Sequence, residues 1–276
     1  MKKILVPTDF SDTSKNAAQF AVKLAADMKD AEIILINVSD KITAGSDGSP
    51  LTEDDDDRQV ILTQALNHMK EDLKAPPTVK ISCTIEKGSS LVETLSRYER
   101  HHSIDLVIMG ITGATQIEQI FMGSNALDMA KESVCPVIIV PPDAKYSQIK
   151  NVLLASDFKD VDTTIPIEPL KATLNAFNKP ALHIVNVDSE HYVELTDDYK
   201  AERAKLEKML IDYKPEFYFI RLFDFLDAIS QFAHDKNIDL ILTVPRHHSF
   251  IGGLFKTSHT KKLAYHSHVP IVAIHE

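Results

Sequence analysis

The chain has 276 residues, 44% hydrophobic and 25% charged, which is the composition of an ordinary globular protein. Its formal net charge of -10 argues against general nucleic-acid binding, and no apolar run reaches the roughly 18 residues of a membrane span. Asp9 ends the first apolar run too early for an export signal, and two cysteines make no disulfide framework. We therefore expect a soluble, cytoplasmic protein with reduced thiols.

Short apolar runs alternate with amphipathic stretches along the first half of the chain. Residues 4–6 are consecutively apolar, which is typical of a buried strand, and residues 11–28 carry apolar side chains at helical spacing. The pattern predicts strands at 2–9, 31–38, 79–88, 104–110 and 136–141, and helices at 11–28, 58–73, 90–102 and 124–133. Between the second strand and the second helix, residues 39–57 are expected to form a polar, acidic loop.

The same pattern occurs twice. Residues 2–12, 31–40, 103–110 and 133–140 align, in the same order, with residues 150–160, 180–189, 237–244 and 267–274. Alternation of strands and helices favours a parallel sheet covered on both faces. We predict two tandem five-stranded parallel-sheet α/β domains, Rossmann-like, at residues 1–143 and 149–276, joined by a proline-containing polar segment.

Glycine is scarce, and its positions are informative. The chain has 8 glycines, where an average chain of this length has roughly 19. Three of the eight, Gly110, Gly113 and Gly123, lie between the predicted fourth strand and the helix that follows it. They are either ordinary turn residues or positions where the backbone must approach a ligand without a Cβ in the way.

The edge of the sheet where these glycines lie is the edge where open parallel sheets bind ligands. Ser124 and Asn125 lie where the following helix begins, and free amides with the helix dipole make an anion site there. Asp9 ends the first strand at the same edge. Its carboxylate can accept hydrogen bonds from a ribose hydroxyl or an adenine amine, or hold a metal ion beside phosphates.

Together these features resemble the universal stress protein family in its ATP-binding branch. That family's phosphate loop is a glycine, two residues, a glycine, nine residues, a glycine, and then serine or threonine. Gly110, Gly113, Gly123 and Ser124 match it without a gap. The resemblance covers the chain once per half and implies the tandem form, with the last strands of the two halves paired as an intrachain pseudo-dimer. Neither a dinucleotide-binding fingerprint nor a P-loop motif is present.

The resemblance also implies site residues for ATP, with or without Mg²⁺. The nucleoside would lie against Pro7, Thr8, Asp9 and Val38. Met109 and Gly110 would contact the ribose and phosphate. The phosphates would be held by Gly113, Gly123, Ser124 and Asn125.

The second half has lost this loop. Val244, His247 and Thr257 replace the three glycines, so we expect no ATP there. Between residues 240 and 274 there are several basic residues and no acidic one. This basic stretch is a solvated loop, an anion site using Arg246 and Lys256, or a metal site formed by His247, His248 and His259.

No set of nucleophile, base and orienting group is recognisable, so an enzyme is the less favoured interpretation. The leading hypothesis is a regulatory protein whose adenine-nucleotide occupancy changes its conformation or its protein partners. The alternatives are a slow Mg²⁺-dependent ATPase and a scaffold with a structural nucleotide. The sequence leaves open whether the chain forms a further homo-oligomer beyond this internal pair.

Overall fold

The computed structural model describes residues 2–28, 30–39, 53–111, 124–187, 196–220, 225–244 and 268–275. The first half contains every strand and helix that its sequence pattern predicts. They are β1 (Lys2–Pro7), α1 (Asp12–Asp27), β2 (Ala31–Ser39), α2 (Glu53–Asp72), β3 (Lys80–Lys87), α3 (Leu91–His102), β4 (Leu106–Gly110), α4 (Ser124–Glu132) and β5 (Val137–Val140).

The described part of the second half repeats this order, with two short helices in place of the first helix. Its elements are β6 (Asn151–Ala155), α5 (Val161–Thr164), α6 (Ile167–Ala176), β7 (Ala181–Val187), α7 (Asp197–Met209), a 3₁₀ turn (Ile211–Tyr213), β8 (Glu216–Ile220), α8 (Phe225–Asp235), β9 (Leu240–Thr243) and β10 (Ile271–Ala273). Two short helices, α5 and α6, replace α1. Pro166 lies between them, and a proline cannot donate the backbone hydrogen bond that would continue the helix.

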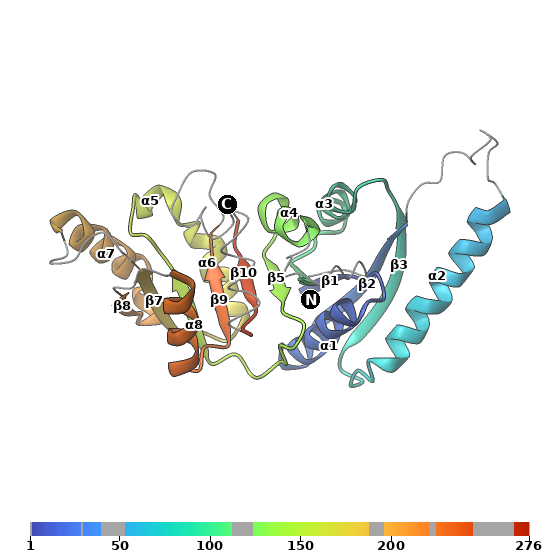
Figure 1. Cartoon of the computed structure of the whole chain (residues 1–276), viewed down its shortest axis with the longest axis horizontal. Helices are drawn as coiled ribbons and strands as arrows, with labels where there is room; N and C mark the ends of the chain where they lie inside the picture. The colour runs from blue at the N-terminus through green and yellow to red at the C-terminus, as the bar shows by residue number, and fades with distance from the viewer. Residues whose placement is uncertain are drawn as a thin grey trace.

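The ten strands of the described residues form one sheet in the order β3-β2-β1-β4-β5-β10-β9-β6-β7-β8 (Figure 1). Neighbouring strands are parallel within each half, whereas β5 and β10 are antiparallel. Ile138 lies opposite Val272, and the repeat aligns these same two residues with each other. The register is therefore symmetric about this pair. The pairing of last strands that the family resemblance implies is present in the structure.

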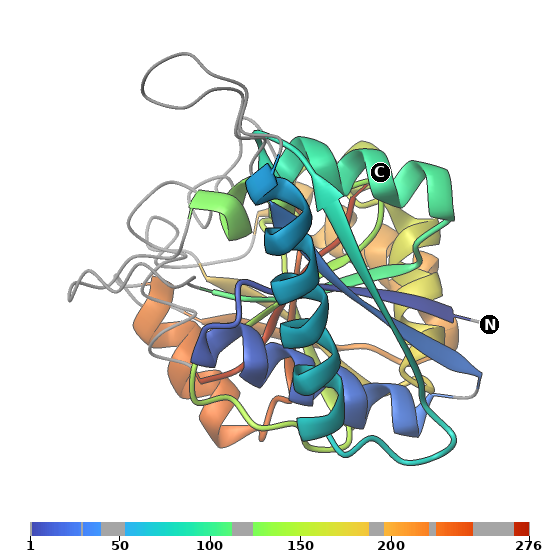
Figure 2. The same cartoon turned by 90° about the vertical axis from the view of Figure 1, so that its right-hand side faces the viewer.

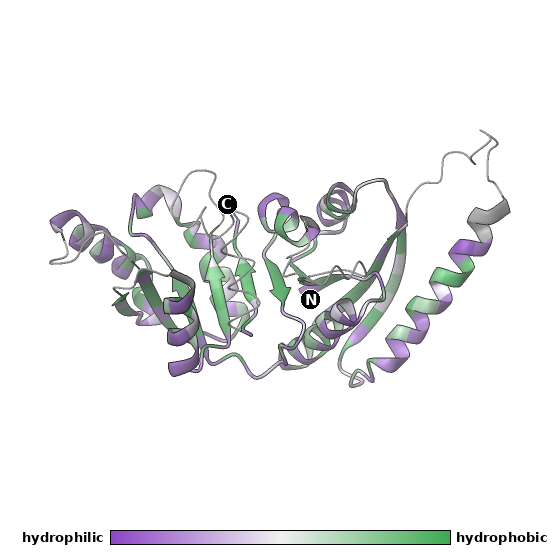
Figure 3. Ribbon diagram, viewed as in Figure 1, coloured by the Kyte–Doolittle hydropathy of each residue, from purple (hydrophilic) through white to green (hydrophobic). Residues whose placement is uncertain are grey.

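Helices cover both faces of the sheet. Residues alternate along β1, so that Ile4 and Val6 pack under α1 while Leu5 packs on the side of α3 and α4. Viewed from the α2 end, α1 and α3 lie on opposite sides of the first strands (Figure 2). The strands are hydrophobic along most of their length, whereas the helices also carry polar side chains (Figure 3). This is the burial pattern expected of a parallel sheet.

The helix α2 begins earlier than the sequence pattern predicts. The acidic run at residues 53–57 was expected to be loop, but it forms the first turns of the helix. Carboxylates are favourable at a helix N-terminus because they oppose the positive end of the helix dipole. No helix in the described part of the chain combines the length and the apolar character needed to cross a membrane.

The repeat extends to individual hydrogen bonds. The Asp105 carboxylate accepts from the Lys3 amide (2.8 Å), and Asp239 accepts from the equivalent amide of Asn151 (2.9 Å). Each aspartate precedes the fourth strand of its half and fixes the start of the first strand beside it. The two halves therefore share local bonding as well as strand order.

Glu99 is a buried carboxyl group on α3, only 1% exposed. Its Oε2 accepts from Ser133 Oγ (3.0 Å) and from the Val134 amide (3.1 Å). Its Oε1 has no hydrogen-bond partner among the described residues. Burial raises the pKa of Glu99, and this outweighs the opposing effect of the two hydrogen bonds.

We expect Glu99→Gln to become more stable relative to the wild type as the pH rises from 5 to 8. A carboxyl group with a raised pKa stabilises the fold at low pH and loses that contribution as the pH rises through its folded pKa. Glutamine keeps an accepting oxygen and does not titrate. Urea denaturation at both pH values measures the difference, with the exposed Glu93→Gln on the same helix as control. The same stability difference at both pH values would contradict this account.

Candidate functional site

The candidate site lies at the topological switch point of the first half, the place where the order of its strands along the sheet reverses. β1 pairs with β2 on one side and with β4 on the other. Loops that leave the carboxyl ends of such strands diverge and leave a crevice, which is where open α/β sheets bind ligands. Thr8, Asp9, Val38 and Gly110 all lie at these strand ends. The fold thus brings them to one edge, as the sequence predicted.

Hydrogen bonds fix the loop after β1. Thr8 is buried, its amide donates to Ile36 O (2.9 Å), and its carbonyl accepts from Asn37 Nδ2 (2.8 Å). Its hydroxyl is hydrogen-bonded to Ser14 Oγ (3.0 Å) and accepts from the Phe10 amide (3.0 Å). Thr8 therefore holds the loop to α1 through its side chain and to β2 through its backbone. No pattern in the sequence indicates the bond from Asn37.

Asp9 is exposed at the rim of this loop. Its Oδ1 accepts from the amide of Ser11 (3.1 Å) and from the Ser11 hydroxyl (2.6 Å). Ser11 in turn caps α1 by accepting from the Ser14 amide (3.3 Å). Phe10, between them, has a φ of 65°, in the left-handed region used in tight turns. The turn holds the Asp9 carboxylate in one place at the solvent-facing rim of the sheet edge.

The apolar residues proposed for the nucleoside pocket differ in exposure. Pro7 is buried, and Met109 is 5% exposed. Val38 is half-buried near the end of β2 and packs against the core beneath α3 and α4. Of these three, Val38 has the most apolar surface to offer a ligand.

Gly110 has a packing role that the sequence did not reveal. A Cβ at this position would lie 2.8 Å from Thr13 O and 2.9 Å from Thr13 C, both backbone atoms of the first turn of α1. The absence of a side chain allows α1 to approach β4. In the second half, Val244 occupies the equivalent position and is buried where α5 and α6 replace α1.

The helix α4 begins at Ser124, as predicted. Its first turn has no acidic residue, and Asn125 is exposed there. Unpaired amides and the helix dipole make such a helix start favourable for an anion. Gly113 and Gly123 lie outside the described residues.

The equivalent strand ends of the second half have the same bonding, but their aspartate is buried. Asn186 Nδ2 donates to Ser156 O (2.9 Å), which repeats the bond from Asn37 to Thr8. Asp157, the counterpart of the exposed Asp9, is only 3% exposed. Its neighbour Phe158 is fully buried and contacts the rings of three aromatic residues: Tyr199, Phe217 and Phe219.

The candidate metal ligands His247, His248 and His259 lie outside the described residues. Within the described ranges, no group of three or more His, Cys, Asp or Glu side chains is arranged to hold a metal ion. Both cysteines are free thiols, and burial raises the pKa of Cys135 to about 12.

Comparison with known proteins identifies relatives. A model of the universal stress protein family matches residues 1–141. Two universal stress proteins of Methanocaldococcus jannaschii are 32% and 29% identical over 52% and 50% of this chain, which is 84% and 94% of their own lengths. The crystal structure of a universal stress protein from Archaeoglobus fulgidus DSM 4304 aligns over 99% of this chain and 96% of its own, at 19% identity and a TM-score of 0.65. The fold of that protein therefore extends over both halves of this one.

We expect Gly110→Ala to lower the free energy of unfolding by about 1–3 kcal/mol, because the new methyl group would overlap backbone atoms of α1. The double variant Gly110→Ala/Thr13→Ala should be less stable than Thr13→Ala by nearly the same amount. Removing the Thr13 side chain relieves little of the overlap, since the closest atoms belong to the main chain. Urea denaturation of the four proteins measures the effect. A Gly110→Ala protein as stable as the wild type would show that α1 does not depend on this close approach.

Proposed function

Because the chain belongs to the universal stress protein family, we propose that its first half binds one adenine nucleotide, ATP, at the edge formed by β1, β2 and β4. The observation that carries the proposal is the meeting of three groups at this switch point: the exposed, positioned carboxylate of Asp9, the apolar surface of Val38, and the start of α4. They match the polar, apolar and anionic parts of a nucleotide.

Each group has a role that follows from its chemistry. Val38 would lie against the adenine ring, and Asp9 would accept hydrogen bonds from a ribose hydroxyl or the adenine amine. The phosphates would lie at Gly113, Gly123, Ser124 and Asn125, with Met109 and Gly110 near the ribose. Pro7 and Thr8 would form the floor beneath the nucleoside.

Magnesium accompanies ATP in solution, and Asp9 is suited to support it. Carboxylate oxygens are among the ligands that Mg²⁺ takes, usually together with phosphate oxygens. Bound beside the phosphates, the ion would neutralise part of their charge. Asp9 would then serve the ion directly or through water, in addition to or in place of the ribose.

The second half, residues 149–276, is proposed to be a family domain without this nucleotide site. The burial of Asp157 supports this proposal, since a buried carboxylate is not available to a ribose in the way that Asp9 is. At the start of α5, the Val161 amide already donates to Glu202 Oε2 (2.8 Å). The biological role we propose is regulatory: nucleotide occupancy of the first domain, residues 1–143, changes how the cytoplasmic chain engages a protein partner.

Calorimetric titration of nucleotide-free protein with ATP and magnesium tests the proposal. We expect one site per chain, abolished by Gly113→Glu, because a carboxylate side chain would enter the space proposed for phosphate and repel it. The matched control is Gly252→Glu, a glycine in the loop of the second half that has lost the motif. That variant should bind as the wild type does.

Two sites per chain would contradict the assignment to the first half alone. Binding that survives Gly113→Glu, or no binding at all, would contradict the nucleotide site itself. Asp9→Asn tests whether the charge of Asp9 acts on the magnesium ion. Weaker affinity for ATP in magnesium, with unchanged affinity in EDTA, would place Asp9 beside the ion.

A further inference from the structure

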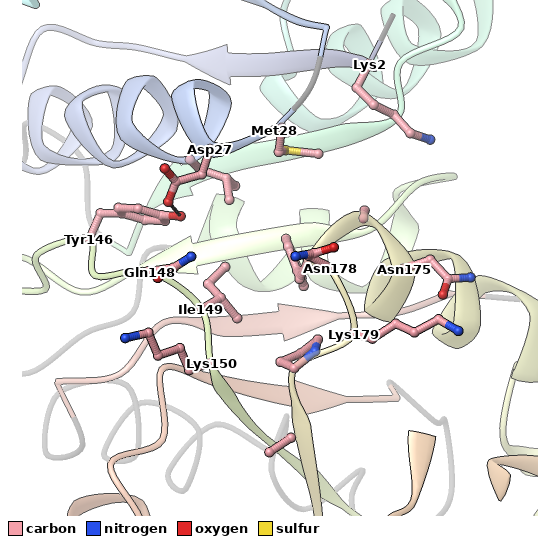
Figure 4. Close-up of a pocket in the computed structure, with 15 residues that line it drawn as sticks. Lys2, Asp27, Met28, Tyr146, Gln148, Ile149, Lys150, Asn175, Asn178 and Lys179 are labelled. Carbon is pink, nitrogen blue, oxygen red and sulfur yellow. Dashed lines mark hydrogen bonds between the residues drawn. The ribbon is translucent and has the colours of Figure 1, made fainter. Parts of the chain in front are cut away.

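A cleft of about 690 Å³ opens between the two halves, at the amino ends of β1 and β6 (Figure 4). The C-terminal ends of α1 and α6 line it, together with the segment that connects β5 to β6. Its volume is within the range of small-molecule sites, roughly 300–1,000 Å³. The candidate nucleotide site is at the carboxyl ends of the strands, so the two are separate.

Equivalent residues of the two halves line this cleft. Lys2 begins β1 and Lys150 directly precedes β6, and the repeat aligns these two lysines. Met28 and Phe177 directly follow α1 and α6, and each lies three residues before the next pair of aligned segments, 31–40 and 180–189. This is the arrangement expected of a cleft on the local twofold relation that the β5–β10 register defines. A ligand here would contact both halves at once.

Hydrogen-bond donors dominate the polar lining. Three lysines (Lys2, Lys150 and Lys179) and three carboxamides (Gln148, Asn175 and Asn178) line the cleft, and all six are exposed. The carboxamides carry acceptors as well, but the ammonium groups are donors only. In Figure 4, Lys2, Lys179 and Asn175 extend toward one end of the cleft, while Lys150 and Gln148 lie at the other.

Asp27, the one carboxylate among the described lining residues, already has a partner. It accepts a hydrogen bond from the Tyr146 hydroxyl (2.6 Å). Burial and the neighbouring Asp27 raise the pKa of Tyr146, so this hydroxyl remains a donor at neutral pH. Lys2 pairs with Asp105 (3.2 Å), and Lys179 lies over the Tyr213 ring (5.5 Å).

Lys150 differs from the other two lysines. Its backbone amide donates to Asp239, but its ammonium group has no ion pair within the described part of the chain. Among the described residues, the lining carries three ammonium groups and one carboxylate, and only the ammonium group of Lys2 is paired with a carboxylate outside the lining, in a chain whose formal net charge is -10. This local reversal of sign favours an anionic ligand.

We propose that this cleft binds a small organic molecule with two separated anionic groups. One group lies at the end formed by Lys2 and Lys179, and the other at the end formed by Lys150. Carboxamides between them bind the oxygens of the ligand body, and Met28 and Phe177 contact its carbon atoms. The ligand joins the halves, because each contributes at least one lysine. Phosphate esters and carboxylates share this chemistry.

Calorimetric titrations with fructose 1,6-bisphosphate and with citrate distinguish the two sources. We expect one of these probes to bind once per chain, with an affinity that falls as salt is added. Lys150→Gln and Lys179→Gln should each weaken binding about five- to tenfold, since each removes a charge-assisted hydrogen bond. Lys208→Gln, on the exposed face of α7 and outside the cleft, is the matched control and should change nothing.

The Gly113→Glu variant separates this site from the proposed nucleotide site. Binding of the probe that persists in Gly113→Glu and weakens in the two lysine variants supports the cleft, whatever the result with ATP. Binding of the bisphosphate alone assigns phosphate esters, and binding of citrate alone assigns carboxylates. Failure of both probes at millimolar concentration, loss of binding in Gly113→Glu, or equal binding by the lysine variants would overturn the proposal.

Discussion

The antiparallel pairing of β5 with β10 is the constraint on which the rest of the architecture depends. Each half alone would be a parallel sheet with an apolar edge strand, because all residues of β5 and β10 are buried in the structure. Pairing the two edges satisfies their backbone groups and protects them from other chains. The symmetric register around Ile138 and Val272 then relates the halves, and it brings the starts of β1 and β6 to one cleft.

Within that frame, a few side chains decide why two copies of one pattern differ. In the first copy Gly110 lets α1 approach β4, and the turn after β1 leaves Asp9 exposed. In the second copy Pro166 divides the corresponding helix, and Asp157 is buried. The repeated geometry of strand and turn is therefore compatible with an exposed aspartate in the first half and a buried one in the second. This asymmetry is the physical basis for proposing a single nucleotide site.

The sequence predicted the elements and their order because buried parallel strands and amphipathic helices have distinct periods. It placed the start of α2 too late, since an acidic run indicates a loop as readily as a helix N-terminus. The bond from Asn37 to Thr8 and the contact of Gly110 with Thr13 join residues distant in the chain, so no local pattern encodes them. The cleft between the halves depends on their packing, which the repeat alone does not specify.

The central claim is the location of the nucleotide, and photolabelling tests it most directly. Wild-type protein would be irradiated with 8-azido-ATP and magnesium, digested, and mapped by mass spectrometry, with and without excess ATP. The account predicts ATP-sensitive label on peptides around β1, the end of β2 or the segment from β4 to α4. Label confined to residues 149–276, or label that excess ATP does not displace, would contradict it.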